Sequence, residues 1–352
     1  MKNVSISPDS IKLVGRNYTT ETRLYPIHSG SGCEFHFTGT KLEVILNPYD
    51  VPDADVPYCN RPRIAVTVNG RFVIKKVIEY SDERYTIISS GSKISADIAV
   101  IKLSEAAFSI GSISFEADDD SVIEPARTAA KRIEFIGDSI TCGYGIDDSN
   151  FNSEFATEAE NSIKSYAFRT AKLLGMECSI FAYSGHGVIS GYTGDGRRNT
   201  NEILPPYYET LGKSYDTVNG MDISGIPWNF NAFPSDIVVV NLGTNDDSFC
   251  KVNENAYDEF ELEYENFIRT VRRCNPSAWL ILCINIIGND MFGHICNAAH
   301  KLISDGDSRI LTFRFTPQNG MLGFGSQWHP SEDTQAYAAE ELADFIRRNT
   351  GE

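Results

Sequence analysis

The feature that most constrains the fold is a change of rhythm near residue 131. From there on, short apolar runs alternate with stretches whose apolar residues recur at helical spacing. The run at 237–242 is continuously apolar, as is typical of a parallel strand covered by helices on both faces. These runs predict a three-layer α/β/α domain over residues 131–352 with a five-stranded parallel sheet. The five runs are 133–136, 178–182, 237–242, 279–284 and 310–313.

Helices are predicted between these strands and after the last one. The first, at 165–174, should stop at Gly175, and the last should be capped by Ser331. An apolar stripe over 257–271 predicts a long helix, and another is expected near 291–304. A loop over 188–235, rich in Gly, Pro, Tyr and Asn, is too long to be a simple connection and is predicted to be functional or an insertion.

Residues 1–125 predict an all-β domain of the β-sandwich or jelly-roll type. The segments 33–37 and 42–46 alternate at strand period, with a turn expected at 38–40. Asn69-Gly70 lies between two β-rich segments and suits a type I′ hairpin turn. A polar linker is expected at 117–130.

Composition limits the classes of partner. The net charge of -17 disfavours nucleic acid and anionic membrane surfaces, and it favours a neutral substrate. No apolar run approaches the roughly 20 residues needed to cross a bilayer. The first residues lack the apolar core of a signal peptide, so we expect a cytoplasmic protein, or a secreted one if a leader has been removed.

The eight cysteines show neither a CxxC pair nor metal-ligand spacing. In a chain of this length they are expected to be reduced and mostly buried thiols rather than a disulfide framework. No metal site and no cofactor are predicted, and the oligomeric state is not predicted from the sequence.

Four polar residues follow predicted strands and could together carry acyl-transfer chemistry. Ser139 follows the strand at 133–136, where crevices form at the carboxyl ends of parallel strands. Each of the four residues also has a purely structural alternative. For example, Gly-Asp-Ser and Asn-Asp are common in turns and helix caps. In order they are Ser139, Gly185, Asn245 and His329.

The ordered set resembles the GDSL/SGNH hydrolase superfamily, whose four blocks contribute Ser, Gly, Asn and His. The whole chain resembles carbohydrate esterase family 2, which joins a jelly roll to a flavodoxin-like SGNH domain. The resemblance implies removal of O-acetyl groups from carbohydrates such as xylan or glucomannan. It implies that Ser139 is the nucleophile and His329 the base. It also implies an oxyanion hole formed by the N–H groups of Ser139 and Gly185 (Gly187 if the register differs) and the side chain of Asn245. Its motifs are 137–145, 184–188, 241–246 and 329–331, with a further similar segment at 228–230.

One departure concerns the third member of a catalytic triad. Many members of the superfamily carry an aspartate three residues before the histidine, whereas this chain has Ser326 there. We therefore predict a Ser139–His329 dyad in which a backbone carbonyl near 325–327, or the Ser326 or Gln327 side chain, orients the ring. A remote carboxylate, with Glu332 or Asp333 nearest in sequence, is the alternative. A neutral acceptor predicts activity that rises with pH through the ordinary histidine range, around 6.5.

Substrate contacts are expected from three residues near these motifs: Trp228, His186 and Trp328. Trp228 could be an aromatic platform for a sugar or could pack its loop onto the domain. Two rival functions stay open, a lipid or aryl esterase on the same scaffold and a non-catalytic carbohydrate-binding protein. The polar and aromatic 188–235 loop favours an acetylated oligo- or polysaccharide as the partner.

Overall fold

The computed structural model describes residues 1–50, 56–288 and 291–351. The chain forms two compact units. Unit 1 comprises Met1–Thr128 together with Phe155–Glu160 and Thr210–Trp228, and unit 2 comprises Ala129–Glu154, Asn161–Glu209 and Asn229–Glu352. The long loop predicted at 188–235 is therefore divided between the two units.

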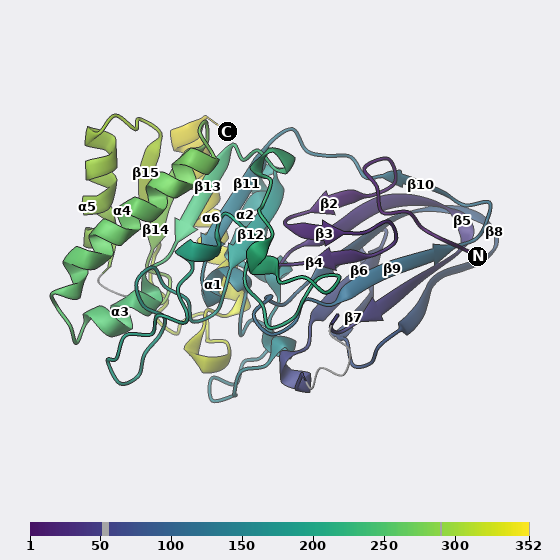
Figure 1. Cartoon of the computed structure of the whole chain (residues 1–352), viewed down its shortest axis with the longest axis horizontal. Helices are drawn as coiled ribbons and strands as arrows, with labels where there is room; N and C mark the ends of the chain where they lie inside the picture. Colours follow the sequence, from purple (N-terminus) through teal and green to yellow (C-terminus); the bar gives the residue numbers. More distant parts are fainter. Residues whose placement is uncertain (51–55, 289–290, 352) are drawn as a thin grey trace. The chain divides into compact units, whose positions relative to one another are not determined.

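Unit 1 is built on antiparallel strands around one apolar core, so the predicted all-β architecture is confirmed. The main path of the sheet is β3-β4-β9-β5-β8-β6-β7 (Figure 1); off this path, β1 pairs with β9, and β2 and β10 pair with β5. The strands are β1 (Lys2–Asn3), β2 (Lys12–Val14), β3 (Asn17–Thr19), β4 (Leu24–Pro26), β5 (Gly32–Asn47), β6 (Arg63–Val68), β7 (Arg71–Val77), β8 (Glu83–Lys102), β9 (Ser112–Ala117) and β10 (Val122–Pro125).

The hairpin at Asn69-Gly70 is confirmed, since both residues have positive φ (51° and 74°) and join β6 to β7. The predicted turn at 38–40 is wrong. Strand β5 runs through it without a break, and its register with β8 shifts between Gly39 and Lys41. This is a β-bulge, in which the Asp118 carboxylate accepts the N–H groups of Thr40 and Lys41.

Part of the predicted linker is also a strand. Residues Val122–Pro125 form β10, which pairs antiparallel with β5 from Thr38 to Phe35. The sequence 117–121 is polar enough to suggest a linker, yet Asp118 is used to hold the bulge of β5. A long-range pairing of this kind leaves little local signal.

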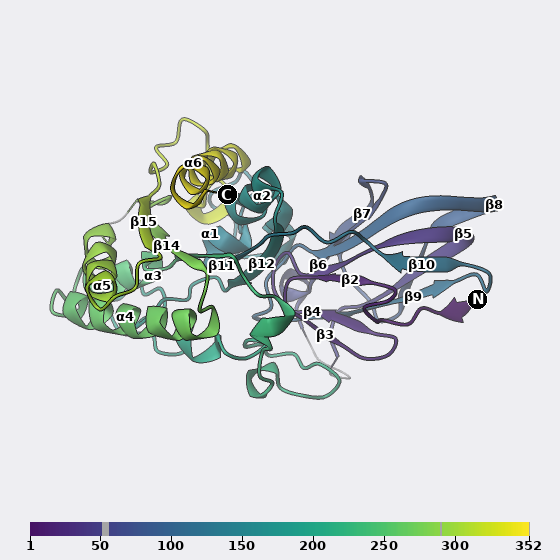
Figure 2. The same cartoon turned by 90° about the horizontal axis from the view of Figure 1, so that it is seen from above.

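Unit 2 contains the predicted five-stranded parallel sheet, with the order β12-β11-β13-β14-β15. This order corresponds to the flavodoxin-like arrangement, with its switch point between β11 and β13. Figure 2 shows α2 and α6 on one side of the sheet and α4 and α5 on the other, which gives the predicted three layers. The strands are β11 (Arg132–Gly137), β12 (Glu177–Ala182), β13 (Ile237–Asn241), β14 (Trp279–Ile284) and β15 (Ile310–Arg314).

The helices of unit 2 follow the predicted apolar stripes. Helix α2 is capped by the Ser165 hydroxyl and ends at Gly175 in the left-handed conformation, and Ser331 caps α6. The helices are α1 (Ser139–Cys142), α2 (Tyr166–Leu174), α3 (Thr244–Cys250), α4 (Ala256–Cys274), α5 (Phe292–Ser304) and α6 (Glu332–Thr350). Short 3-10 helices among the described residues are η1 (Tyr58–Asn60), η2 (Thr157–Ala159), η3 (Ser162–Lys164), η4 (Pro205–Tyr207), η5 (Ile223–Gly225), η6 (Phe230–Ala232) and η7 (Ser326–Trp328).

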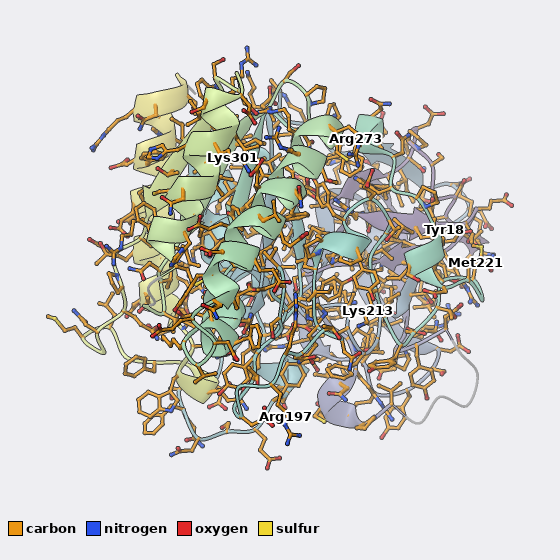
Figure 3. The ribbon with its side chains drawn as sticks, turned by 60° about the vertical axis from the view of Figure 1, so that its left-hand side comes forward. Tyr18, Arg197, Lys213, Met221, Arg273 and Lys301 are labelled. Atoms are coloured by element: carbon orange, nitrogen blue, oxygen red, sulfur yellow. The ribbon has the colours of Figure 1, made fainter. Side chains whose placement is uncertain are left out.

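The outer faces of α4 and α5 carry exposed cations that pair with acidic side chains. Arg273 contacts Glu209 at 2.9 Å and Lys301 contacts Glu265 at 2.6 Å (Figure 3). The exposed pair of Arg273 and Glu209 adds little stability, whereas Lys301 neutralises a buried carboxylate. None of the described helices combines the length and the apolar character that a membrane crossing requires.

Candidate active site

Ser139 lies at the sharp turn that connects β11 to α1. Asp138 is the N-cap of α1, and its carboxylate accepts the N–H of Ile140 at 3.0 Å. The first N–H groups of a helix have no acceptor within it, so the Ser139 N–H is directed to the space beyond the sheet edge. The Ser139 side chain is largely enclosed, with the residue 8% exposed. Asp138 thus has a structural role in the turn.

His329 reaches Ser139 from the loop before α6. The Nε2 atom of His329 lies 2.8 Å from the Ser139 Oγ, although 190 residues separate them in sequence. The Nδ1 atom lies 3.2 Å from the carbonyl oxygens of Ser326 and Gln327. The predicted pair is therefore brought together, with backbone carbonyls at the far side of the ring.

A tight turn aims those carbonyls at the ring. Gln327 and Trp328 both have positive φ (50° and 63°), which is uncommon for residues other than glycine and strained. The Gln318 side chain donates to the Trp328 carbonyl at 2.8 Å, and the Gly325 N–H donates to the His329 carbonyl at 2.8 Å. These contacts hold the strained turn, which suggests that its geometry is functional.

Gly145 explains why the first motif ends in glycine. Its φ of +78° disfavours other residues, and a side-chain carbon there would lie 2.9 Å from the Ser326 oxygen and 3.1 Å from the His329 Cβ. The His329 loop therefore packs directly on the backbone that follows Ser139. Tyr144 adds an edge-to-face contact with the His329 ring, at 4.6 Å between centroids.

Gly185 and Asn245 follow the strands on either side of β11, at the same edge of the sheet. Gly185 has a φ of +74°, so a glycine is favoured at this position. The Asn245 Nδ2 donates to the His186 carbonyl at 2.8 Å and lies 3.5 Å from the Asp138 Oδ2. The contact with Asp138 is at the long limit of a hydrogen bond, so this second N–H could serve an oxyanion only by turning away from Asp138.

Comparison with known proteins identifies the domain. The sequence signature of the GDSL-like Lipase/Acylhydrolase family matches residues 133–342, more than half of the chain. The chain belongs to this family. The resemblance predicted from the four motifs is thereby confirmed.

The relatives of this GDSL chain are carbohydrate esterases. It is 28% identical over 328 residues to a cellulase/esterase, CelE, of Acetivibrio thermocellus, covering 92% of this chain and 37% of that protein. It is 27% identical over 227 residues to an acetylxylan esterase / glucomannan deacetylase of Cellvibrio japonicus, covering 62% and 57% of the two chains. The chain thus spans less than two thirds of the length of these curated relatives.

Solved structures extend the similarity to both units. A family two carbohydrate esterase from Clostridium thermocellum in complex with cellohexaose has a TM-score of 0.81 at 25% identity, covering 97% of this GDSL chain and 99% of that one. An acetyl xylan esterase from Butyrivibrio proteoclasticus has a TM-score of 0.86 at 22% identity, covering 99% and 98%. The predicted likeness to carbohydrate esterase family 2 is therefore confirmed.

Asp246 supports the candidate site in a way that the sequence did not predict. Its buried carboxylate accepts the N–H groups of Val188, Ile189 and Ser190 at 2.7–3.0 Å, so it anchors the loop that follows Gly185. Burial raises the pKa of Asp246 to about 6, although these N–H groups lower it. Burial likewise raises the pKa of Asp138 to about 7, and the charge of Asp246 adds to the effect. Asp246 was visible in the motif, but its partners lie 56–58 residues away.

The pKa of His329 corrects the expectation of an unperturbed histidine. Burial of the ring lowers the pKa to about 4, and the carbonyls of Ser326 and Gln327 raise it only in part. Enclosure by protein disfavours the imidazolium, whereas a neutral carbonyl offers little charge to stabilise it. The histidine is therefore held in its neutral form well below pH 6.5.

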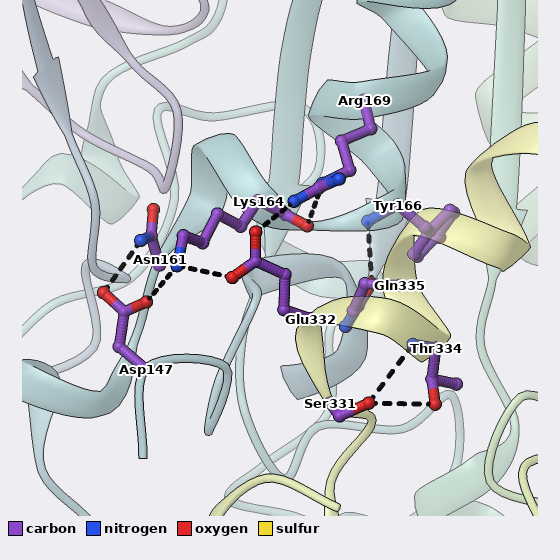
Figure 4. Close-up of polar contacts among 9 residues, drawn as sticks. All are labelled: Asp147, Asn161, Lys164, Tyr166, Arg169, Ser331, Glu332, Thr334 and Gln335. Atoms are coloured by element: carbon purple, nitrogen blue, oxygen red, sulfur yellow. Dashed lines mark hydrogen bonds and ion pairs between the residues drawn. The ribbon is translucent and has the colours of Figure 1, made fainter. Parts of the chain in front are cut away.

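Glu332, the carboxylate nearest to His329 in sequence, is paired with two cations (Figure 4). Glu332 contacts the Lys164 Nζ at 2.6 Å and the Arg169 Nη2 at 2.6 Å, and Lys164 also contacts Asp147 at 2.8 Å. These ion pairs lower the pKa of Glu332. They join the start of α6 to the segments at 147 and 164–169, and they direct the carboxylate to these cations.

The three predicted substrate-contact residues differ in their surroundings. Trp328 is 53% exposed, and its ring contacts Phe151 at 4.3 Å and Phe324 at 5.2 Å between centroids. His186 is buried and packs against Tyr183, which leaves little of its ring for a substrate. Trp228 belongs to unit 1, where its ring lies 5.2 Å from the Arg16 guanidinium. This contact fits the alternative in which Trp228 packs its loop onto the domain.

The remaining groups to consider are the cysteine thiols and possible metal ligands. None of the eight cysteines forms a disulfide; five are buried, and Cys59 is exposed. Within residues 1–50, 56–288 and 291–351, no group of three or more His, Cys, Asp or Glu side chains is arranged to hold a metal ion.

Proposed function

We propose that this chain is a serine esterase that removes O-acetyl groups from carbohydrates, such as acetylated xylan or glucomannan, through a Ser139–His329 dyad. The observation that carries the proposal is the 2.8 Å contact between the Ser139 Oγ and the His329 Nε2, combined with the carbonyls 3.2 Å from Nδ1. A neutral histidine whose Nδ1–H is held by a carbonyl presents a basic nitrogen to the serine.

The reaction follows from this geometry. The Ser139 Oγ attacks the acetyl carbonyl carbon while its proton passes to the His329 Nε2. The resulting oxyanion accepts hydrogen bonds from the N–H groups of Ser139 and Gly185 and from the Asn245 side chain. His329 then returns the proton to the sugar oxygen as its bond to carbon breaks. A water molecule then gives a proton to the same histidine and attacks the acetyl-enzyme. The bond to the Ser139 Oγ breaks, the histidine returns the proton to that oxygen, and acetate leaves.

A dyad rather than a triad is supported by the contacts of the neighbouring carboxylates. Glu332 is engaged by Lys164 and Arg169. Among the described residues, the recorded hydrogen-bond partners of the His329 Nδ1 are backbone carbonyls alone. Such carbonyls fix the tautomer but carry no full charge to stabilise the imidazolium.

A sugar is the substrate class favoured by the surface near His329 and by the relatives. Trp328 presents an exposed ring one residue from the base, and an aromatic face packs well against the C–H face of a pyranose. Relatives are named acetylxylan esterase / glucomannan deacetylase, and one similar structure is described in complex with cellohexaose.

Three substrates test the proposal and its rivals: 4-nitrophenyl acetate, a long-chain 4-nitrophenyl ester and acetylated xylan. We expect turnover of the first and third and little of the second. Preference for the long chain would instead indicate a lipid esterase, and absence of all turnover would indicate a binding protein. Ser139→Ala should abolish hydrolysis in a folded protein, and retention of more than a small fraction of activity would refute Ser139 as nucleophile.

A further inference from the structure

A carboxylate with spare hydrogen-bonding capacity lies beside the predicted oxyanion donor. A side-chain carbon placed on Gly185 would lie 3.2 Å from the Glu202 Oε2. Glu202 is half-buried, and among the described residues Asn199 alone donates to its carboxylate, from Nδ2 at 2.8 Å. An ionised carboxylate can accept about four hydrogen bonds, so most of its capacity is unused.

The backbone around this carboxylate is tied to the site. The Gly187 N–H donates to the Glu202 carbonyl at 3.0 Å, and the Leu204 N–H donates to the Gly187 carbonyl at 2.9 Å. The Tyr192 N–H donates to the Gly185 carbonyl at 2.8 Å. Glu202 is therefore carried by a loop that is hydrogen-bonded to both sides of His186.

Further contacts fix the loop and Asn199. The Ser190 Oγ accepts the N–H of Asn199 at 3.0 Å, and Asp246 holds the N–H of Ser190. Tyr192, in the same loop, is 62% exposed. The Glu202 side chain therefore belongs to a loop that hydrogen bonds hold in place, as is expected for a preorganised binding group.

The charge of Glu202 argues against a purely structural role. A negative charge near a group that must stabilise an oxyanion opposes the charge that develops in the transition state. A neutral glutamine could accept the same hydrogen bond from Asn199. A carboxylate is the stronger acceptor, by about twofold, for a hydroxyl of a bound ligand.

We propose that Glu202, held by Asn199, binds a free hydroxyl of the sugar whose neighbouring oxygen carries the acetyl group. This inference rests on the proposed function and narrows its substrate to partly acetylated sugars with an unmodified hydroxyl close to the ester. The same carboxylate disfavours sugars that carry an acid group at that position, because like charges repel.

The test compares kcat/KM on a partly acetylated xylo-oligosaccharide, its fully acetylated form and 4-nitrophenyl acetate. For Glu202→Ala, the loss on the partly acetylated sugar should exceed the loss on the other two by about 10- to 100-fold, the range for a hydrogen bond to a charged group. Glu202→Gln keeps an acceptor for Asn199 and should give an intermediate loss, which guards against a folding defect in the alanine variant.

Glu261→Ala is the control. Its carboxylate is also half-buried and also accepts from an asparagine Nδ2 at 2.8 Å, from Asn297 on α5, and it differs from Glu202 in a further contact with the His294 Nδ1 at 2.6 Å. Equal losses on all three substrates, or Glu202 variants that behave like Glu261→Ala, would overturn the subsite alone. A wild-type enzyme that hydrolyses 4-nitrophenyl acetate but neither sugar would overturn the proposed carbohydrate substrate, and the subsite with it.

Discussion

At the scale of single residues, Asn245 connects the oxyanion hole to its support. One N–H of its carboxamide donates to the His186 carbonyl, and the other makes a long contact with Asp138 that it would exchange for the proposed oxyanion. Asn245→Ala should lower kcat by ~10²–10³-fold with little change in KM, because the bond strengthens only as charge develops. Steady-state kinetics on an acetyl ester measure both constants, and circular dichroism controls for folding. An effect confined to KM would assign Asn245 to ground-state binding instead.

The pKa of His329 sets the pH dependence. Only the neutral imidazole accepts the serine proton, so activity rises as pH increases through the pKa of the histidine. Because burial lowers that pKa to about 4, we expect kcat/KM to rise near pH 4 and to be level by about pH 6. A profile measured with folding checked at each pH tests this. An inflection near the ordinary histidine value of about 6.5 would contradict it.

At the scale of elements, the start of α6 carries the two carboxylates closest in sequence to His329. Glu332→Gln removes a charge that pairs with Lys164 and Arg169, all of them 30–43% exposed. We expect a loss of stability below about 1 kcal/mol and only a few-fold loss of kcat. Urea unfolding and steady-state kinetics measure the two effects.

The same variant separates a dyad from a triad. Loss of a true triad acid lowers kcat by ~10⁴-fold. A decrease of that size in folded Glu332→Gln, or in Asp333→Ala, would show that a carboxylate orients the histidine. Asp344 forms an exposed ion pair with Arg347 near the other end of α6, so Asp344→Asn is a control for the loss of one surface charge.

At the scale of the whole molecule, the two units are interleaved along the chain. Phe155–Glu160 and Thr210–Trp228 lie within the α/β half of the sequence but pack in unit 1. Asp216 shows that the segment Thr210–Trp228 is bonded to the first part of the chain. Its buried carboxylate accepts the N–H groups of Asp50 and Ile110. Glu160 likewise accepts the N–H of Glu105 at 2.6 Å.

A fragment of residues 129–352 should therefore be unstable. Without Met1–Thr128, the two inserted segments lose the partners of their buried polar groups, and each unsatisfied group costs about 1–3 kcal/mol. We expect a lower Tm than for the full chain and rapid proteolysis within 210–228. Equal Tm and equal protease resistance of the two proteins would contradict this expectation.

The sequence by itself determined the main elements of unit 2 and predicted the residues of the candidate site. Apolar periodicity is local, so it located the five parallel strands and the helices at α2, α4, α5 and α6. Parallel strands share one carboxyl edge, so residues after β11, β12 and β13 were expected to meet there. Ser139, Gly185 and Asn245 could be chosen for that reason.

The tertiary structure decided what depends on contacts between distant residues. Gly39 reads as a turn in sequence, but pairing with β8 and the Asp118 contacts make it a bulge in a continuous strand. The pKa of His329 depends on the protein that surrounds the ring, and no local pattern encodes its desolvation. Glu202 lies beside Gly185 only because hydrogen bonds fold the intervening loop back on itself. Local spacing specifies secondary structure, whereas burial, charge and support of the site arise from long-range packing.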